Sequence, residues 1–225
     1  YLICFLLLNG SFAFYFGHFF ERGQADLQSM FIFQPWVYLL FIPGIAMRLW
    51  SEEFRLKTIL QITTLPVSVA TLVWGKFIAS WLFCSLALFL TFPFWIIVNL
   101  LGSPDNLVIF AGYLGSWLIA GCMLAISQTM SALTKNQVIA LVLSVFANLF
   151  FFLSGLEYVL ELFRKITSPI IVDMIASFSF LSHFATISRG LLELRDIVFF
   201  ASVIILFNYA STLIVGFRTA GTTRW

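Results

Sequence analysis

Residues 47–76 have the sequence M-R-L-W-S-E-E-F-R-L-K-T-I-L-Q-I-T-T-L-P-V-S-V-A-T-L-V-W-G-K, between two long apolar runs. The stretch packs several charges together and then meets a Leu-Pro break: Arg48, Glu52, Glu53, Arg55 and Lys57, followed by Leu65 and Pro66. Its neighbours are apolar enough to lie in lipid, and this stretch is not. A polar segment at such a place is where a membrane protein would meet a soluble partner, so we expect a docking element here.

A second interpretation of this stretch stays open. If residues 48–65 form a helix, Glu52 and Arg55 are three positions apart and can pair. Pro66 would then end the helix. The alternative is an amphipathic helix that only anchors the chain among the lipid headgroups. The residue pattern favours docking and anchoring equally.

The composition indicates a membrane protein. Of the 225 residues, 61% are hydrophobic and 10% are charged, whereas soluble domains carry roughly 25% charged residues. A soluble fold cannot cover this much apolar surface, so lipid must be the solvent for most of it. The net charge of +2 is too small to indicate a nucleic-acid partner. The three Cys lie scattered in apolar runs, which argues against a disulfide framework or a metal site.

Six apolar stretches predict an all-α membrane protein with six transmembrane helices. They lie at about residues 1–20, 31–46, 70–101, 107–133, 137–156 and 197–217. Pro93 predicts a kink in the third. Between residues 157 and 196, charges separate apolar pieces that are too short to span, which predicts re-entrant or interfacial helices. Because the chain begins in an apolar run without Met, we also expect that part of the N-terminus is missing.

The basic residues predict the orientation in the membrane. Six spans put both termini, residues 47–76 and the turn at 134–136 on one side. That side carries Arg48, Arg55, Lys57, Lys76, Lys135, Arg218 and Arg224, and the other carries Arg22, Arg164, Lys165, Arg189 and Arg195. The positive-inside rule therefore makes the first side cytoplasmic.

The sequence holds no recognisable catalytic set. It has no G-x-x-x-x-G-K-[ST] loop, so we expect this chain not to bind ATP itself. His18 and His183 are far apart and without adjacent carboxylates, which favours structural or interfacial roles. The spans are nearly free of ionisable groups, which argues against a secondary carrier powered by an ion gradient. The energy for transport would have to come from another subunit.

Three motifs resemble those of ABC-2 type permeases, the membrane subunits of ATP-binding-cassette exporters, nearest to the bacterial gliding-associated and copper-enzyme-maturation group. The first comprises Arg48, Glu52-Glu53, Arg55, Thr58, Leu65-Pro66-Val67 and Gly75-Lys76. The second is S-A-L-T-K-N-Q at residues 131–137, and the third runs from Phe180 to Asp196. The family pattern has Gly where this chain has Lys57, and often Glu where it has Leu60, which Gln61 follows.

The resemblance implies an ABC-2 exporter fold in which a coupling helix at about 48–65 lies on a separate ATPase. The implied contacts are Arg48, Glu52, Glu53, Arg55, Thr58, Leu65, Pro66, Lys135 and Asn136. Re-entrant helices in residues 157–196 would form an extracytoplasmic cap that includes His183, Phe184, Arg189 and Gly190.

The resemblance also implies partners and a location. Two permease chains, identical or related, would flank the translocation path in the bacterial inner membrane, with both termini cytoplasmic. Each would pair with an ATPase that binds ATP and Mg, so this chain would be no enzyme and hold no cofactor. Membrane lipid and auxiliary extracytoplasmic subunits are further implied partners. The alternatives are a membrane assembly or maturation factor that does not transport, and a secondary carrier.

Overall fold

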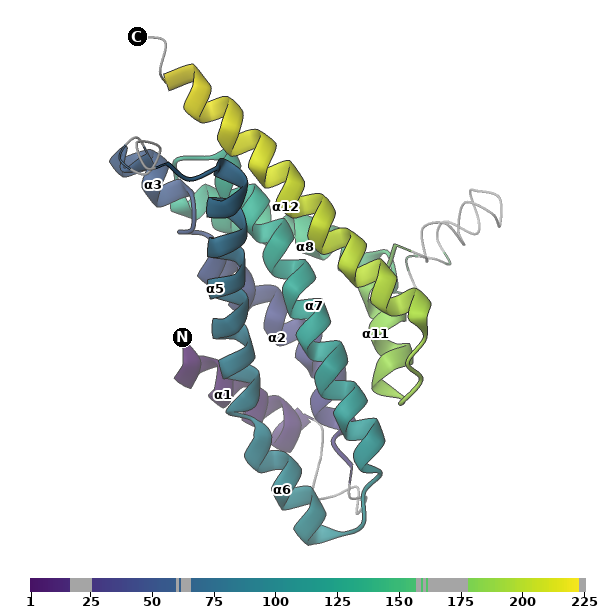
Figure 1. Ribbon diagram of the computed structural model, residues 1–225. Helices are drawn as coiled ribbons and strands as arrows, with labels where there is room; N and C mark the ends of the chain where they lie inside the picture. The colour runs from purple at the N-terminus through teal and green to yellow at the C-terminus, as the bar shows by residue number, and fades with distance from the viewer. Residues whose placement is uncertain are drawn as a thin grey trace. The chain divides into compact units, whose positions relative to one another are not determined.

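The computed structural model describes residues 1–16, 26–59, 61, 66–156, 159, 161 and 178–222 (Figure 1). In this part of the chain the regular elements are all helical. They are α1 (Leu2–Ser11), the π-helix η1 (Phe12–Phe16), α2 (Gln28–Ala46), α3 (Ser51–Leu56), α5 (Val69–Phe89), α6 (Phe92–Leu101), α7 (Asn106–Leu133), α8 (Gln137–Leu153), α11 (Phe180–Ser188) and α12 (Leu194–Thr222). The all-α architecture predicted from the sequence is confirmed.

Four helical stretches are long and apolar enough to cross a membrane: Gln28–Leu56, Val69–Leu101, Asn106–Leu133 and Leu194–Thr219. They contain the predicted second, third, fourth and last spans. Helices α1 and α8 are apolar but shorter, so the predicted first and fifth spans stay predictions. Of the predicted re-entrant region, α11 is the helix whose bounds are described, and residues 162–177 lie outside the described ranges.

The third span is interrupted where the sequence predicts a kink. Helix α5 ends at Phe89 and α6 begins at Phe92. Pro93 lies in the first turn of α6, where its missing N–H costs no helical hydrogen bond. The hydroxyl and the backbone N–H of Thr91 both donate to the carbonyl of Leu88, at 2.6 and 3.0 Å, so Thr91 closes the end of α5.

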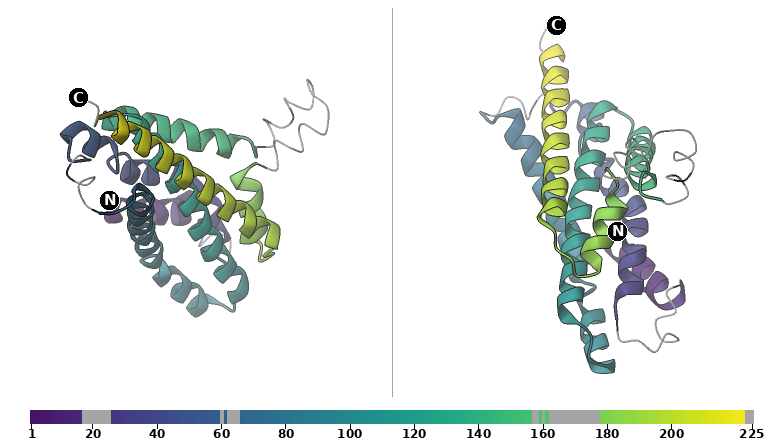
Figure 2. Two further views of the ribbon diagram at one scale, coloured as in Figure 1. Left: turned by 45° about the horizontal axis from the view of Figure 1, so that its top comes forward. Right: turned by 90° about the vertical axis from the view of Figure 1, so that its right-hand side faces the viewer.

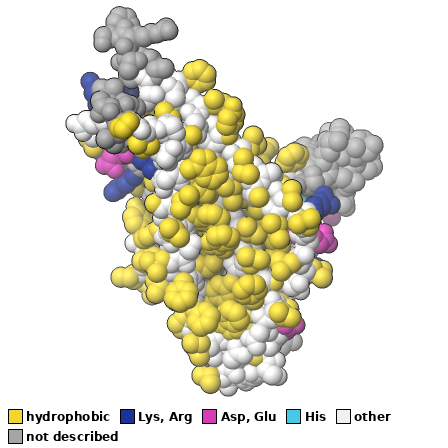
Figure 3. All heavy atoms as spheres, viewed as in Figure 1, with side chains coloured by type: hydrophobic (Ala, Val, Ile, Leu, Met, Phe, Trp, Pro, Cys, Tyr) yellow, Lys and Arg dark blue, Asp and Glu magenta, His cyan; other side chains and the backbone are white. Residues whose placement is uncertain are grey.

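The chain folds as two compact units. Unit 1 comprises residues 1–37, 85–119 and 149–198, and unit 2 comprises residues 38–84, 120–148 and 199–225. Helices α2, α5, α7, α8 and α12 contribute residues to both units, and Figure 2 shows α12 as one uninterrupted helix. Hydrophobic side chains crowd the face drawn in Figure 3, as expected of a surface that contacts lipid.

Helix α7 and the stretch that contains α2 are the two most buried of the four candidate spans. In their most apolar windows 67% of the residues of Asn106–Leu133 and 61% of those of Gln28–Leu56 are buried, against 28% for Val69–Leu101 and 28% for Leu194–Thr219. Small residues on α7 let neighbouring side chains approach closely in unit 1. The ring of Phe31 on α2, for example, packs edge-on against Tyr113, with 5.4 Å between the ring centroids, and lies over Gly112.

This close approach gives a stability prediction. Gly112→Ala is expected to lower the free energy of unfolding by about 1–3 kcal/mol, because the added Cβ would lie 2.4 Å from the ring of Phe31. Thermal unfolding in detergent measures the loss. Gly75→Ala is the matched control: no described residue would lie within 4 Å of its added Cβ, so helix propensity predicts a slight gain. Equal losses in the two variants would contradict the packing argument.

Candidate functional site

The turn Met47–Trp50 joins α2 to α3, and we call residues 47–56 the elbow. Ser131, near the end of α7, binds this turn at both ends. Its Oγ accepts hydrogen bonds from the backbone N–H groups of Trp50 and Ser51, each at 3.2 Å, and donates to the carbonyl of Met47 at 3.0 Å. Ser51 Oγ also donates to the Met47 carbonyl. One hydroxyl group thus fixes the bend.

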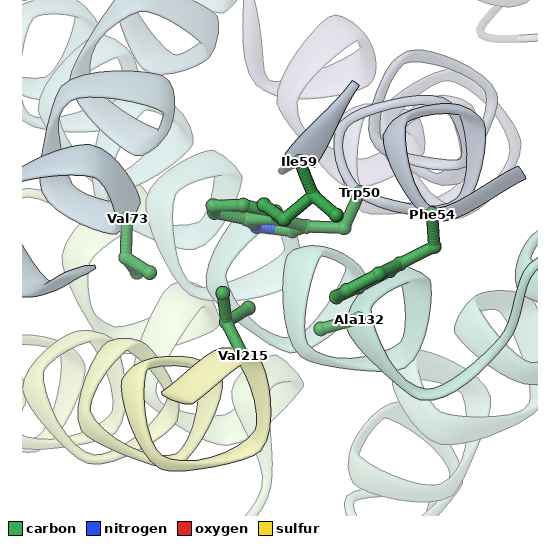
Figure 4. Close-up of a cluster of buried hydrophobic side chains, with 6 residues drawn as sticks. All are labelled: Trp50, Phe54, Ile59, Val73, Ala132 and Val215. Carbon is green, nitrogen blue, oxygen red and sulfur yellow. The ribbon is translucent and has the colours of Figure 1, made fainter. Parts of the chain in front are cut away.

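The apolar side of the elbow is buried inside the protein. Trp50 and Phe54 belong to a cluster with side chains from α5, α7 and α12 and from the segment after α3 (Figure 4): Val73, Ala132, Val215 and Ile59. Trp50 is fully buried and Phe54 nearly so. An interfacial anchor would instead lay these side chains in lipid. The apolar side of this stretch therefore packs against the protein itself, and docking on a partner stays a prediction.

Lys76 of α5 binds the elbow through three groups. Its Nζ donates to the carbonyl of Leu49 at 2.6 Å and to Oε1 of Glu53, and it lies 4.2 Å from the ring centroid of Trp50. The side chains of Lys76 and Glu53 are 23% and 21% exposed, so this ion pair is screened less than one on the surface. Glu53, an implied ATPase contact, has an intramolecular partner here, and its intermolecular role stays a prediction.

Arg218 of α12 closes the other side of the elbow. Its Nη1 donates to the carbonyl of Ala132, the penultimate residue of α7, at 2.7 Å. Its guanidinium carbon lies 4.6 Å from the ring centroid of Phe54, a cation–π distance. Through this one side chain, α12 contacts both α3 and the end of α7.

The outward face of the elbow carries charge. Arg48 and Arg55 are exposed, and Glu52 is partly exposed. The predicted pair between Arg55 and Glu52 is confirmed at 3.5 Å. Such an exposed pair contributes only about 0–1 kcal/mol to stability. The charged side chains of this face therefore contribute little to the stability of the fold.

The other implied contacts lie around the elbow or after α7. Lys135 and Asn136 are exposed in the turn between α7 and α8, three to five residues beyond the anchoring Ser131 and Ala132. Asn136 Oδ1 accepts from the N–H of Val138 at 2.9 Å and so caps α8. Thr58 is half-buried and Pro66 is exposed, whereas Leu65 lies outside the described residues.

Lys57 ends α3 and makes the elbow helix shorter than expected. The sequence predicts one helix over residues 48–65, but α3 covers Ser51–Leu56, and Lys57 has φ 59° and ψ 14°, in the left-handed region. Among the described residues other than Gly, only Lys57 has a positive φ. Left-handed C-caps favour Gly, which has no Cβ to clash. The family pattern that this chain resembles has Gly at the position of Lys57, and Gly is the residue that best adopts this left-handed conformation.

Lys57→Gly is accordingly expected to raise the free energy of unfolding by about 1 kcal/mol, because it removes the left-handed strain of a side chain. The increase would appear as a higher unfolding temperature in detergent. Lys135→Gly is the control, since it also removes an exposed Lys from a turn but one where φ is not positive. If the two variants shift the unfolding temperature equally, relief of strain at Lys57 is not the cause.

The implied cap residues lie together in unit 1. His183 of α11 and Asp196 of α12 form a buried pair with 2.6 Å between Nδ1 and Oδ1. No carboxylate adjoins His183 in the sequence, but the fold brings Asp196 to it. Phe184 is buried, while Arg189 and Gly190 are exposed in the turn after α11. Gly190 has φ +87° and an added Cβ there would lie 3.0 Å from Val108, which explains its glycine.

The sequence did not predict a site role for four residues. Lys76, Ser131 and Arg218 hold the elbow, and Asp196 pairs with His183 of the implied cap. Lys76, Ser131 and Asp196 belong to the three quoted motifs, so the motifs contained their signal. Nothing in the sequence around Arg218 indicates its role.

Four helical stretches long and apolar enough to cross a membrane indicate a multi-pass membrane protein, and the charged elbow is fixed at the end of one of them, α7. The sequence profile of the family described as "ABC-2 family transporter protein" matches residues 1–155, more than half of the chain. The chain therefore belongs to this family and is a permease-type membrane component of an ABC transporter system. No curated protein and no solved structure gives a significant match.

Proposed function

We propose that this chain is the permease subunit of an ATP-driven exporter of the ABC-2 type. Two such chains, identical or related, form the translocation path in the bacterial inner membrane. A separate ATPase binds ATP and Mg and docks on the elbow and on the turn at 134–136. The six-span topology, the cytoplasmic termini and the extracytoplasmic cap belong to this proposal, and the family match supports it.

The two-sided construction of the elbow is the observation that carries the proposal. Its outward face presents the charged side chains of Arg48, Glu52 and Arg55 to a partner. Its inward face is held by side chains of three other helices: Lys76 of α5, Ser131 of α7 and Arg218 of α12. A partner that pushes on α3 therefore acts on three helices at once.

Charge reversal on the outward face tests the docking. The chain is purified from its native membranes, its co-purifying P-loop ATPase is identified, and the complex is reconstituted in lipid. The double variant Arg48→Glu and Arg55→Glu is expected to weaken binding of the ATPase at least tenfold, equivalent to about 1.4 kcal/mol. Arg189→Glu is the matched control, because Arg189 is an exposed Arg at the end of α11. A stable, active chain without an ATPase would overturn the proposal.

The same preparation separates the two alternative functions. A secondary carrier would lose transport when the proton gradient collapses while ATP remains. A membrane assembly or maturation factor would bind its client without ATP-dependent transport, and metal analysis of the purified protein addresses the metal-handling form of that alternative. The proposed permease instead depends on ATP and on its partner.

A further inference from the structure

Three consecutive residues of α7 each bond a different helix of unit 2. Ser127 Oγ accepts from Nδ2 of an α8 residue at 2.8 Å, and Gln128 Nε2 donates to an α5 carbonyl at 3.1 Å. Thr129 Oγ1 lies 2.8 Å from a hydroxyl oxygen of α12 and within 2.9 Å of two carbonyl oxygens, one on α12 and one at Ala125 of its own helix. The partner residues are Asn148 of α8, Val73 of α5, and Ser211 and Phe207 of α12.

Helix geometry explains how one turn reaches three neighbours. Successive side chains of an α-helix are about 100° apart around its axis, so residues 127, 128 and 129 point in three directions. Two residues further on, Ser131 binds the elbow turn. Residues 127–131 of α7 thus bond α5, α8, α12 and the elbow, and we call them the junction.

Within the described residues, the junction and its α8 partner each carry one unpaired acceptor. Gln128 Oε1 and Asn148 Oδ1 have no hydrogen-bond partner in the described part of the chain, although both residues are fully buried. Buried polar groups are nearly always paired, so unpaired ones call for an explanation. An unpaired acceptor can receive a donor when the helices shift, so the network is open to a change of partners.

We propose that the junction transmits movement of the elbow to α5, α8 and α12, with Ser127, Gln128 and Thr129 as positioning residues for the three branches. Apolar contacts would let helices slide past one another in lipid, whereas directional hydrogen bonds fix their register. This inference rests on the proposed function, because the ATPase supplies the movement. The linkage itself is a property of this chain and is measured without the partner.

The test uses the full chain in lipid nanodiscs with a trifluoromethyl label on one introduced cysteine. Val138→Cys reports on α8 and Phe217→Cys reports on α12, since both positions are well exposed. Cys4→Ser removes the exposed native thiol, and the other two cysteines are buried. Lys76→Met then releases the elbow from α5. Each ¹⁹F resonance is expected to shift by more than its line width.

The branches are then cut one at a time. Thr129→Val is expected to reduce the ¹⁹F shift of the α12 label by at least half and to leave the shift of the α8 label unchanged. Ser127→Ala is expected to reduce the shift of the α8 label by at least half and to leave that of the α12 label unchanged. Thr129→Ser keeps the hydroxyl and is expected to keep the α12 response. Thr212→Val is the matched control: the Thr212 hydroxyl bonds the carbonyl of Asn208 in its own helix, so both responses remain.

Several results would overturn the junction. One is the absence of any shift with Lys76→Met, and another is a response that survives both branch variants. If a single branch variant abolishes the ¹⁹F shifts of both labels, the helix packing as a whole has been weakened, and the proposed junction is rejected. If Thr129→Val fails to fold, Thr129→Ala is compared with Thr129→Ser on the same terms. Failure of the proposed function appears separately, as a missing ATPase interaction while the ¹⁹F linkage persists.

Discussion

His183→Ala is expected to lower the free energy of unfolding by about 1–3 kcal/mol, the loss typical of leaving a buried hydrogen-bonding group without its partner. The side chains of His183 and Asp196 are only 8% and 4% exposed. Removing the imidazole leaves the carboxylate of Asp196 buried, and its Oδ2 already has no hydrogen-bond partner among the described residues. A buried carboxylate without a donor loses hydration that nothing replaces. Helix α11 would lose this hydrogen bond to α12.

Denaturant or thermal unfolding in detergent checks this expectation, and a graded series makes it specific. Asp196→Asn keeps an oxygen that accepts from the imidazole, so it is expected to cost clearly less than Asp196→Ala. Ser182→Ala is the control within the same helix, because Ser182 is exposed. If Asp196→Asn and Ser182→Ala destabilise as much as His183→Ala, the paired hydrogen bond is not the source of the stability.

Lys76→Glu is expected to reduce the ATPase stimulation by the permease about tenfold or more in the reconstituted complex, a change of about 1.4 kcal/mol in coupling. The substitution places a carboxylate beside Glu53 and the carbonyl of Leu49, where Nζ now donates two hydrogen bonds. Repulsion between the two acids would push the elbow away from α5. Stability should also fall, by about 1–3 kcal/mol.

A charge swap separates the ion pair from general damage. Glu53→Lys alone is expected to resemble Lys76→Glu, and the double variant is expected to recover part of the stimulation because it restores opposite charges. Recovery stays partial because the bond to Leu49 and the contact of Lys76 with the Trp50 ring are lost. A double variant no better than either single variant would mean that the pair does not hold the elbow.

The features that the sequence predicts correctly depend on short-range patterns. Length and apolarity locate the second, third, fourth and last spans. Pro93 predicts the break between α5 and α6, because a missing N–H acts within one turn of helix. The pairing of Glu52 with Arg55 follows from their spacing on one helical face.

The features that the sequence did not predict depend on contacts between distant residues or on one backbone angle. Lys76 and Glu53 are 23 positions apart, and Arg218 and Ala132 are 86 apart. His183 and Asp196 are separated by 13 positions and a turn that Gly190 permits. Lys57 shortens the elbow helix through a left-handed conformation that no Lys favours by itself. These pairings require the packed helices that bring their partners together.

The contribution of α12 to the elbow bears on biosynthesis. Arg218 and Val215 lie in the last turns of α12, which leaves the ribosome after the elbow, and they complete the surroundings of Phe54 and Trp50. The elbow therefore reaches its final packing only after α12 has entered the membrane. An ATPase that recognises the packed elbow would bind chains in which α12 is already inserted and leave earlier intermediates unbound.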